Sequence, residues 1–125
     1  MSASTILVVE DDSIQRRQIA RVLLQAGYNV YEACEGLEAI RMLHARKADL
    51  VLTDIRMPCL DGISLLKYIK IFFQDVPVVL ITAYPEETEE LDPDAFLCKP
   101  FGEKELLAWV QRLIKPPDYH PPFQG

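Results

Sequence analysis

The sequence has no apolar run long enough for a membrane span, no basic patch and no paired spacing of cysteines. A transmembrane helix needs about 20 consecutive apolar residues, so we expect no membrane segment. The net charge is −6, whereas nucleic-acid-binding proteins carry clustered lysines and arginines. We therefore expect no direct binding to DNA or RNA, and the adjacent Arg16 and Arg17 are better explained as one solvated helix face.

The three cysteines also exclude a class of protein. Cys34, Cys59 and Cys98 are an odd number without paired spacing, which predicts free thiols in a reducing compartment rather than a disulfide framework or a metal site. The first residues lack the basic region, apolar core and cleavage site of a signal peptide. Together these features predict a cytoplasmic protein.

The 125 residues, half of them apolar, suit a single domain with a sizeable core. Apolar runs typical of strands alternate with amphipathic stretches typical of helices, which predicts βαβ units and a parallel sheet. The predicted strands cover residues 6–9, 28–34, 49–54, 77–82 and 95–99. The predicted helices cover residues 13–26, with Ser13 as N-cap, and then 37–46, 63–73 and 103–114.

Two segments do not follow this alternation. Residues 83–94 are polar and contain Pro85 and Pro93, so they predict a short helical segment at most. Residues 116–125 are rich in proline and cannot continue a helix. We therefore predict a domain over residues 1–115, followed by an extended tail or the start of a linker.

Polar residues end four of the predicted strands. Glu10, Asp11 and Asp12 follow the first, Asp54 ends the third, Thr82 ends the fourth and Lys99 ends the fifth. The carboxyl ends of parallel strands meet at one edge of the sheet, where open α/β sheets bind their ligands. The sequence thus predicts acidic groups, a hydroxyl and an ammonium at one point.

The chemistry of this set favours phosphoryl transfer. Carboxylates of Glu10, Asp11 and Asp54 would repel one another, and a hard divalent cation such as Mg²⁺ or Mn²⁺ would relieve the repulsion. Lys99 and Thr82 would complete a cradle for a tetrahedral anion. Asp54 would then be the nucleophile that forms an acyl phosphate.

Four motifs carry a resemblance to a known family. They are ILVVEDD at residues 6–12, DIRMP at 54–58 with Asp61 and Gly62, ITA at 81–83, and KPF at 99–101. In this order they resemble the receiver domain of the bacterial response-regulator family, the phosphoacceptors of two-component signalling. The resemblance implies a doubly wound, five-stranded parallel sheet with helices on both faces, a flavodoxin-like fold similar to that of the chemotaxis regulators.

The resemblance also implies a role for each site residue. The positions correspond to a phosphoacceptor at Asp54, Mg²⁺ ligands at Glu10, Asp11 and the backbone carbonyl of Arg56, a switch hydroxyl at Thr82, a phosphoryl-binding cation at Lys99, and a rotating aromatic at Phe96. It implies a cis peptide between Lys99 and Pro100. A histidine kinase or a histidine phosphotransfer protein would donate the phosphoryl group. Strand five and the last helix, with Trp109, would contact an effector or a second copy.

Two departures from the family pattern qualify these expectations. The stretch from Thr82 to Lys99 is shorter than usual, which predicts that the fourth helix is short or irregular. Arg56 and Tyr84 occupy the two positions that tune self-dephosphorylation in the family. Neither carries a carboxylate or a side-chain amide that could orient water, so we expect slow hydrolysis.

Simpler explanations exist for several of these residues. Asp54 could be a turn residue at the end of its strand. The acids after the first strand, or Asp12 alone, could stabilise the dipole of the helix that follows. Thr82 and Lys99 could be ordinary residues at strand ends. Phe96 could pack in the core, and Trp109 could be half-buried packing rather than a partner contact.

Three functional classes remain open. The first is a signalling phosphoacceptor, which catalyses only its own phosphorylation and dephosphorylation. The second is a hydrolase acting on a small phosphorylated substrate; against it, the chain has no cap segment and carries Arg56 where a second acid would be needed. The third is an interaction module of the same fold that works without phosphate, which the short segment after Thr82 favours.

Overall fold

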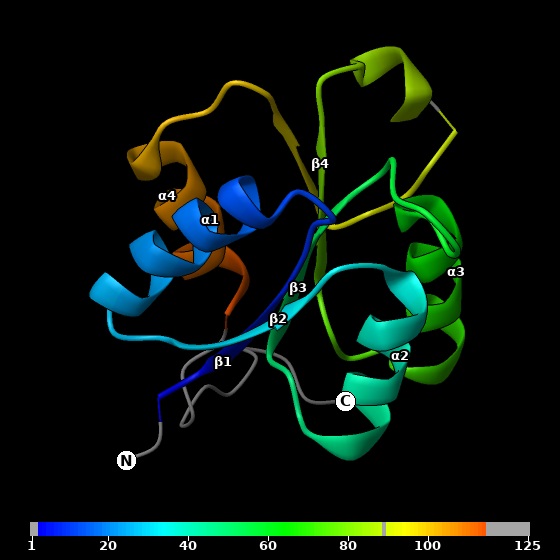
Figure 1. Ribbon diagram of the computed structural model, residues 1–125, viewed down its shortest axis with the longest axis horizontal. Coiled ribbons are helices and arrows are strands. Elements are labelled where there is room, and N and C mark those ends of the chain that lie inside the picture. The colour runs from blue at the N-terminus through cyan, green and yellow to red at the C-terminus, as the bar shows by residue number, and fades with distance from the viewer. Residues whose placement is uncertain (1–2, 89, 115–125) are drawn as a thin grey trace, which may run out of the picture.

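The computed structural model describes residues 3–88 and 90–114 of the chain (Figure 1). The predicted tail at residues 116–125 lies outside these described residues, and its boundary remains a prediction. Strands and α-helices alternate over the described part in the predicted order. They are β1 Thr5–Val9, α1 Ser13–Gln25, β2 Asn29–Ala33, α2 Gly36–Ala45, β3 Leu50–Asp54, α3 Gly62–Phe72, β4 Val78–Thr82, β5 Ala95–Cys98 and α4 Glu103–Leu113.

The five strands form one parallel sheet in the order β2-β1-β3-β4-β5. Val9 lies opposite Thr53, and Thr82 lies opposite Cys98, so the residues that follow these strands reach the same edge of the sheet. The predicted fold class is confirmed.

Side chains on the two faces of the sheet form two separate cores. Leu7 and Val9 of β1 pack on the face covered by α2 and α3, whereas Ile6 and Val8 pack on the face covered by α1 and α4. Figure 1 shows the helices in these two pairs on opposite sides of the sheet. A parallel sheet covered on both faces requires apolar residues at consecutive strand positions, which explains the unbroken apolar runs of β1, β3 and β4.

The start of α1 differs from the prediction by one residue. Asp12 is the N-cap, and its Oδ1 accepts hydrogen bonds from the backbone N–H groups of Ile14 at 2.9 Å and Gln15 at 3.1 Å. Ser13 is the first helical residue, so its prediction as N-cap is wrong. A carboxylate satisfies two of the free N–H groups at a helix start and also faces the positive end of the helix dipole.

The connection between β4 and β5 contains a single 3₁₀ turn, η1 Pro85–Thr88, and no α-helix among its described residues. The prediction of a short or irregular fourth helix is therefore confirmed. Proline lacks the N–H that an α-helix interior needs, which limits helix formation here. The chain returns to the sheet through Asp94, whose Oδ2 accepts a hydrogen bond from the backbone N–H of Val78 at 2.8 Å.

Gly62 is the point at which α3 presses against the end of β3. Its N–H donates to the carbonyl of Ile55 at 2.8 Å. A Cβ at this position would lie 2.0 Å from the carbonyl oxygen of Asp54 and 2.9 Å from Cα of Ile55. Only glycine permits this close approach, because both obstacles are backbone atoms that cannot turn aside.

We predict that Gly62→Ala lowers the free energy of unfolding by about 3 kcal/mol, because the added methyl group displaces backbone at the end of β3. Urea unfolding monitored by circular dichroism measures the change. Gly102→Ala is the control, since a Cβ there meets nothing within 4 Å. Equal losses of stability in the two variants would contradict this account of Gly62.

Candidate functional site at the carboxyl edge of the sheet

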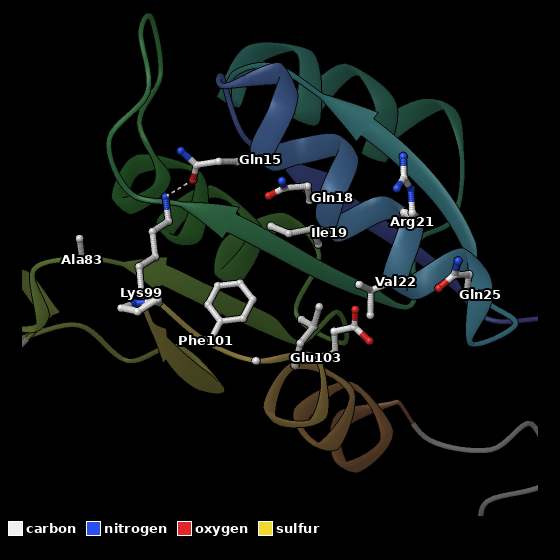
Figure 2. Close-up of a pocket in the computed structure, with 13 residues that line it drawn as sticks. Gln15, Gln18, Ile19, Arg21, Val22, Gln25, Ala83, Lys99, Phe101 and Glu103 are labelled. Carbon is white, nitrogen blue, oxygen red and sulfur yellow. Dashed lines mark hydrogen bonds between the residues drawn. The ribbon is translucent and has the colours of Figure 1, made fainter.

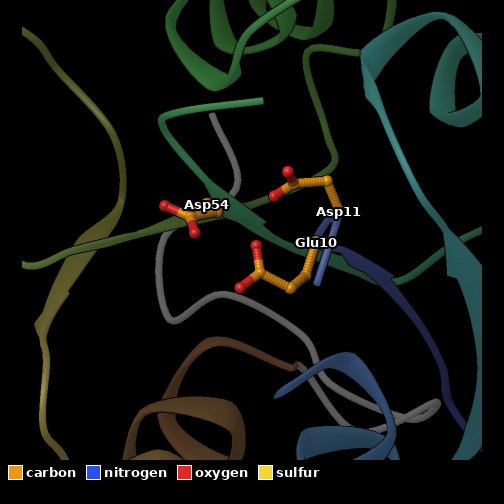
Figure 3. A group of neighbouring side chains, drawn as sticks. All are labelled: Glu10, Asp11 and Asp54. Carbon is orange, nitrogen blue, oxygen red and sulfur yellow. The ribbon is translucent and has the colours of Figure 1, made fainter. Parts of the chain in front are cut away.

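Three carboxylates converge where β1 and β3 end. Glu10 and Asp11 follow β1, Asp54 is the last residue of β3, and the two strands are hydrogen-bonded neighbours. One carboxylate oxygen from each residue lies within 4.8 Å of the others (Figure 3). The predicted acidic cluster is therefore present.

Lys99 reaches this cluster from beyond the end of β5. Its Nζ lies 2.8 Å from Asp54 Oδ2 and 3.4 Å from Glu10 Oε1. A third contact, at 2.9 Å, joins Nζ to Oε1 of Gln15 on α1 (Figure 2). The peptide between Lys99 and Pro100 is cis, as the resemblance implied.

Glu10 is the most strongly perturbed group of the site. Only 3% of the residue is exposed, and burial is the largest of the effects that together raise the pKa of its carboxyl group from 4.5 to about 8. The contact with Asp54 and the negative charge of Asp54 contribute to this rise, whereas Lys99 opposes it. For Lys99, burial opposes the positive charge, but the bonds to Asp54 and Glu10 outweigh it and raise its pKa.

The residues of the cluster fit a hard divalent cation. All three donors are carboxylate oxygens, the ligands that Mg²⁺ and Mn²⁺ prefer. Oε2 of Glu10 is buried and has no hydrogen-bond partner among the described residues. A buried polar atom without a partner is costly, and a bound cation would satisfy it. The backbone carbonyl of Arg56 as a further ligand remains a prediction.

Asp54 is held in one orientation but is still reachable from solvent. Its Oδ1 accepts a hydrogen bond from the backbone N–H of Ile55 at 2.7 Å, while Oδ2 faces Lys99. The side chain is 14% exposed. A carboxylate fixed by two donors and open on one side has the geometry that a nucleophile needs.

Thr82 and Phe96 lie on the two strands beyond β3. Thr82 is buried at the end of β4, and its Oγ1 accepts a hydrogen bond from the backbone N–H of Tyr84 at 2.8 Å. Phe96 on β5 is 39% exposed, which rules out simple packing in the core. Their roles as switch residues remain predictions.

Arg56 and Tyr84 contact each other, which the sequence did not indicate. The guanidinium carbon of Arg56 lies 4.4 Å from the centroid of the Tyr84 ring, a cation–π contact. The two residues come from the loops that follow β3 and β4, and they therefore join these loops beside Asp54.

Sequence reasoning missed Arg16. Its Nη1 donates to the carbonyl of Glu10 at 2.7 Å, and its Nε lies 3.1 Å from Glu32 Oε1. The interpretation of Arg16 as part of a solvated face is thus wrong, whereas Arg17 is 74% exposed at its side chain. The sequence could have indicated this contact, because Arg16 falls in the first turn of the predicted helix 13–26. From there a long side chain can reach back over the ends of the strands.

Trp109 is half-buried on α4 and packs against the core beneath α1. The guanidinium of Arg112 lies over its ring at 5.2 Å. The packing explanation is therefore confirmed. The role of Trp109 as a partner contact stays a prediction, which the half-buried ring neither supports nor contradicts. Cys34, Cys59 and Cys98 are free and exposed, as expected.

The sequence pattern of the response regulator receiver domain matches residues 6–111. The chain belongs to this family. It is 34% identical over 115 residues to the response regulator MprA of Mycobacterium ulcerans, a match that covers 88% of this chain and 50% of the relative. This receiver domain therefore spans about half the length of that relative.

Solved receiver structures share the fold. The response regulator TrrA of Thermotoga maritima, in complex with Mg²⁺ and BeF, has a TM-score of 0.83 and 31% identity, covering 88% of this chain and 98% of that chain. The receiver domain of a histidine kinase from Syntrophus aciditrophicus has a TM-score of 0.87 and 29% identity, covering 98% of each chain. No helix in the described part of this receiver is long and apolar enough to cross a membrane.

We predict that Glu10→Gln changes how stability depends on pH in the presence of EDTA. The folded pKa of Glu10 lies above its unfolded value, so the folded protein binds the extra proton between pH 4.5 and about 8. The contribution of Glu10 to stability is therefore present below that interval and is lost as pH rises through it. Thermal unfolding measured at several pH values across this range should show that the melting temperature falls less with rising pH in the variant than in the wild type.

Added Mg²⁺ provides the matching control. Because the cation binds the charged carboxylate, it should stabilise the wild type more at the alkaline end of the range than at the acidic end. Parallel stability profiles of the wild type and Glu10→Gln in EDTA would contradict the electrostatic account of this residue.

Proposed function

We propose that this receiver domain accepts a phosphoryl group on Asp54 from a histidine kinase or a histidine phosphotransfer protein. The observation that carries the proposal is the pairing of Asp54 with the Lys99 ammonium at 2.8 Å, inside an acidic cluster suited to Mg²⁺. The free, exposed cysteines support a reducing, cytoplasmic location for this activity.

In the proposed reaction a carboxylate oxygen of Asp54 attacks the phosphorus atom of a phosphohistidine. A P–O bond forms to Asp54 while the P–N bond to the donor breaks. The electron pair leaves with the imidazole nitrogen, which takes up a proton. The product is an acyl phosphate on Asp54 and a neutral histidine on the donor.

Lys99 compensates the negative charge that arrives with the phosphoryl group. Its ammonium already lies beside Asp54, so a small side-chain movement brings it to a phosphoryl oxygen. A divalent cation held by Glu10, Asp11 and Asp54 would supply further positive charge at the same point. Ile55 keeps Asp54 in place through its backbone N–H.

The proposed response begins at Thr82 and Phe96. Thr82 would turn its hydroxyl toward the phosphoryl group and give up the hydrogen bond from Tyr84. Phe96 is exposed on β5, where it lies opposite Leu80 of β4, and would change its packing in turn. An effector or a second copy would read the change along β5 and α4.

We predict that acetyl phosphate labels the protein once, at Asp54, and only when Mg²⁺ or Mn²⁺ is present. An anionic donor cannot approach the acidic cluster without a cation to reduce its charge. Intact-mass measurement of the wild type and Asp54→Ala, each with and without EDTA, provides the test.

Each class of function gives a different result in this experiment. Undiminished labelling of Asp54→Ala would refute the proposal. Steady release of phosphate from a small metabolite would indicate a hydrolase. A wild type that is not labelled and binds the same partner as Asp54→Ala would indicate an interaction module that does not need phosphate. The single 3₁₀ turn between β4 and β5 favours this possibility.

We predict that the phosphorylated protein loses its phosphoryl group slowly, because Arg56 and Tyr84 stack on each other and neither can act as a base for water. Arg56→Asn combined with Tyr84→Glu should shorten the lifetime about tenfold, since the variant removes the stack and adds a carboxylate and an amide that can orient water. Decay of the phosphorylated species, followed by mass, measures the effect.

The single variant Tyr84→Ala separates the two causes. It removes the stack without adding a group that orients water, so a short lifetime there would assign the effect to shielding. An unchanged decay rate in the double variant would show that these positions do not control the access of water.

A further inference from the structure

Each of the three N–H donors of the Lys99 ammonium has an acceptor. Two are the acids Asp54 and Glu10, and the third is the side-chain oxygen of Gln15, at 2.9 Å. Gln15 is an exposed residue of the first turn of α1, and it lines a groove of about 770 Å³ between α1 and the start of α4 (Figure 2). It is the one uncharged acceptor among the three.

The orientation of the Gln15 amide is fixed by Asp12. The side-chain Nε2 donates to Asp12 Oδ2 at 3.3 Å, and the backbone N–H donates to Asp12 Oδ1 at 3.1 Å. Because the amide nitrogen faces a carboxylate that can only accept, the amide oxygen must face Lys99. The cap that begins α1 therefore also aims an acceptor at the ammonium.

We infer that Gln15 is a positioning residue that holds Lys99 at the α1 side of the site when a divalent cation occupies the acidic cluster. The inference rests on the proposed function. A cation bound to Asp54 and Glu10 competes with Lys99 for the same oxygens and repels the ammonium. Gln15 is neutral and lies outside the acidic cluster, so its bond to Lys99 survives this exchange.

Held there, Lys99 stays within reach of a phosphoryl group on Asp54. Without Gln15 the ammonium would have only the two acids as partners, and a bound cation would drive it toward solvent. The side chain of Lys99 is 25% exposed, so an outward path is open to it. Gln15 would thus preserve the charge that the incoming phosphoryl group requires.

A change of charge at Gln15 distinguishes positioning from a simple surface contact. In Gln15→Glu the new carboxylate pairs with Lys99 and draws it away from Asp54. The cation then meets less competition and binds more tightly, whereas an anionic phosphoryl mimic meets a neutralised lysine and binds more weakly.

The second variant, Gln15→Met, has nearly the same shape but no acceptor. Lys99 is then no longer held, so the affinity for the cation and the affinity for the phosphoryl mimic both fall.

Calorimetric titration of the full chain measures both affinities. Mg²⁺ is titrated into metal-free protein, and beryllofluoride is then titrated at saturating Mg²⁺. Gln18→Glu and Gln18→Met are matched controls, because Gln18 is exposed on the same helix and lines the same groove. They carry the same changes of charge and shape without the contact to Lys99.

For Gln15→Glu we expect Mg²⁺ affinity to rise about threefold and beryllofluoride affinity to fall about tenfold, with smaller effects in Gln18→Glu. For Gln15→Met we expect both affinities to fall by about threefold. Equal shifts in the Gln15 and Gln18 variants, or wild-type binding by Gln15→Met, would overturn the inference while leaving the proposed function intact.

The same titrations on the wild type test the proposed function itself. A wild type that binds neither Mg²⁺ nor beryllofluoride would overturn the proposed function and this inference with it. A second readout needs no ligand: the Lys99 ammonium, observed by nitrogen NMR in metal-free protein, should exchange its protons faster in Gln15→Met than in Gln18→Met. Equal exchange in the two variants would show that Gln15 does not hold Lys99.

Discussion

The site depends on the burial of Glu10 and its repulsion from Asp54, which Lys99 balances only in part. One ammonium contacts both carboxylates, yet burial, together with the contact and charge of Asp54, still raises the pKa of Glu10 to about 8. Its Oε2 also has no partner among the described residues. Burial of so much like charge would be unfavourable in a protein that only had to fold. This imbalance would favour the binding of a second cation at this edge of the receiver, as the proposed function requires.

The fold reduces this repulsion without removing it. In a parallel sheet each crossover helix starts near the edge where the preceding strand ends, so the N-termini of α1 and α3 both lie at the carboxyl edge (Figure 1). Asp12 and Asp61 cap these two helices and take up their first N–H groups. The positive ends of the helix dipoles therefore face the acidic cluster. Gly62 makes the approach of α3 possible, because a side chain there would collide with the backbone of Asp54.

The sequence was sufficient to predict the strands, their direction and the residues at their ends. Apolar runs that end in Asp54, Thr82 and Lys99 allow few other arrangements once the strands are parallel. Contacts between long side chains could not be predicted in this way. The bond from Arg16 to the carbonyl of Glu10 depends on rotamers and on how close two elements lie, which no sequence spacing specifies.

The same limit applies to finer features of the site. Asp12 and Ser13 are both good N-caps, and their order in the chain does not show which one the backbone uses. The Gln15 contact to Lys99 joins residues 84 positions apart, and the Arg56 contact to Tyr84 joins two irregular loops. In contrast, the prolines of the segment after Thr82 excluded a long helix directly, because their effect is local to the backbone.

The hydrogen bond from Tyr84 to Thr82 would link the two parts of the proposed mechanism, the switch at Thr82 and the control of hydrolysis at Arg56 and Tyr84. The hydroxyl oxygen of Thr82 accepts a hydrogen bond from the backbone N–H of Tyr84, and the ring of Tyr84 stacks on Arg56. In the proposed response, a turn of this hydroxyl toward Asp54 would give up that bond and free the backbone of Tyr84. The proposed lifetime of the phosphoryl group and the proposed conformational response would then depend on the same short segment. Because η1 is one turn long, this segment has little structure of its own to resist the movement.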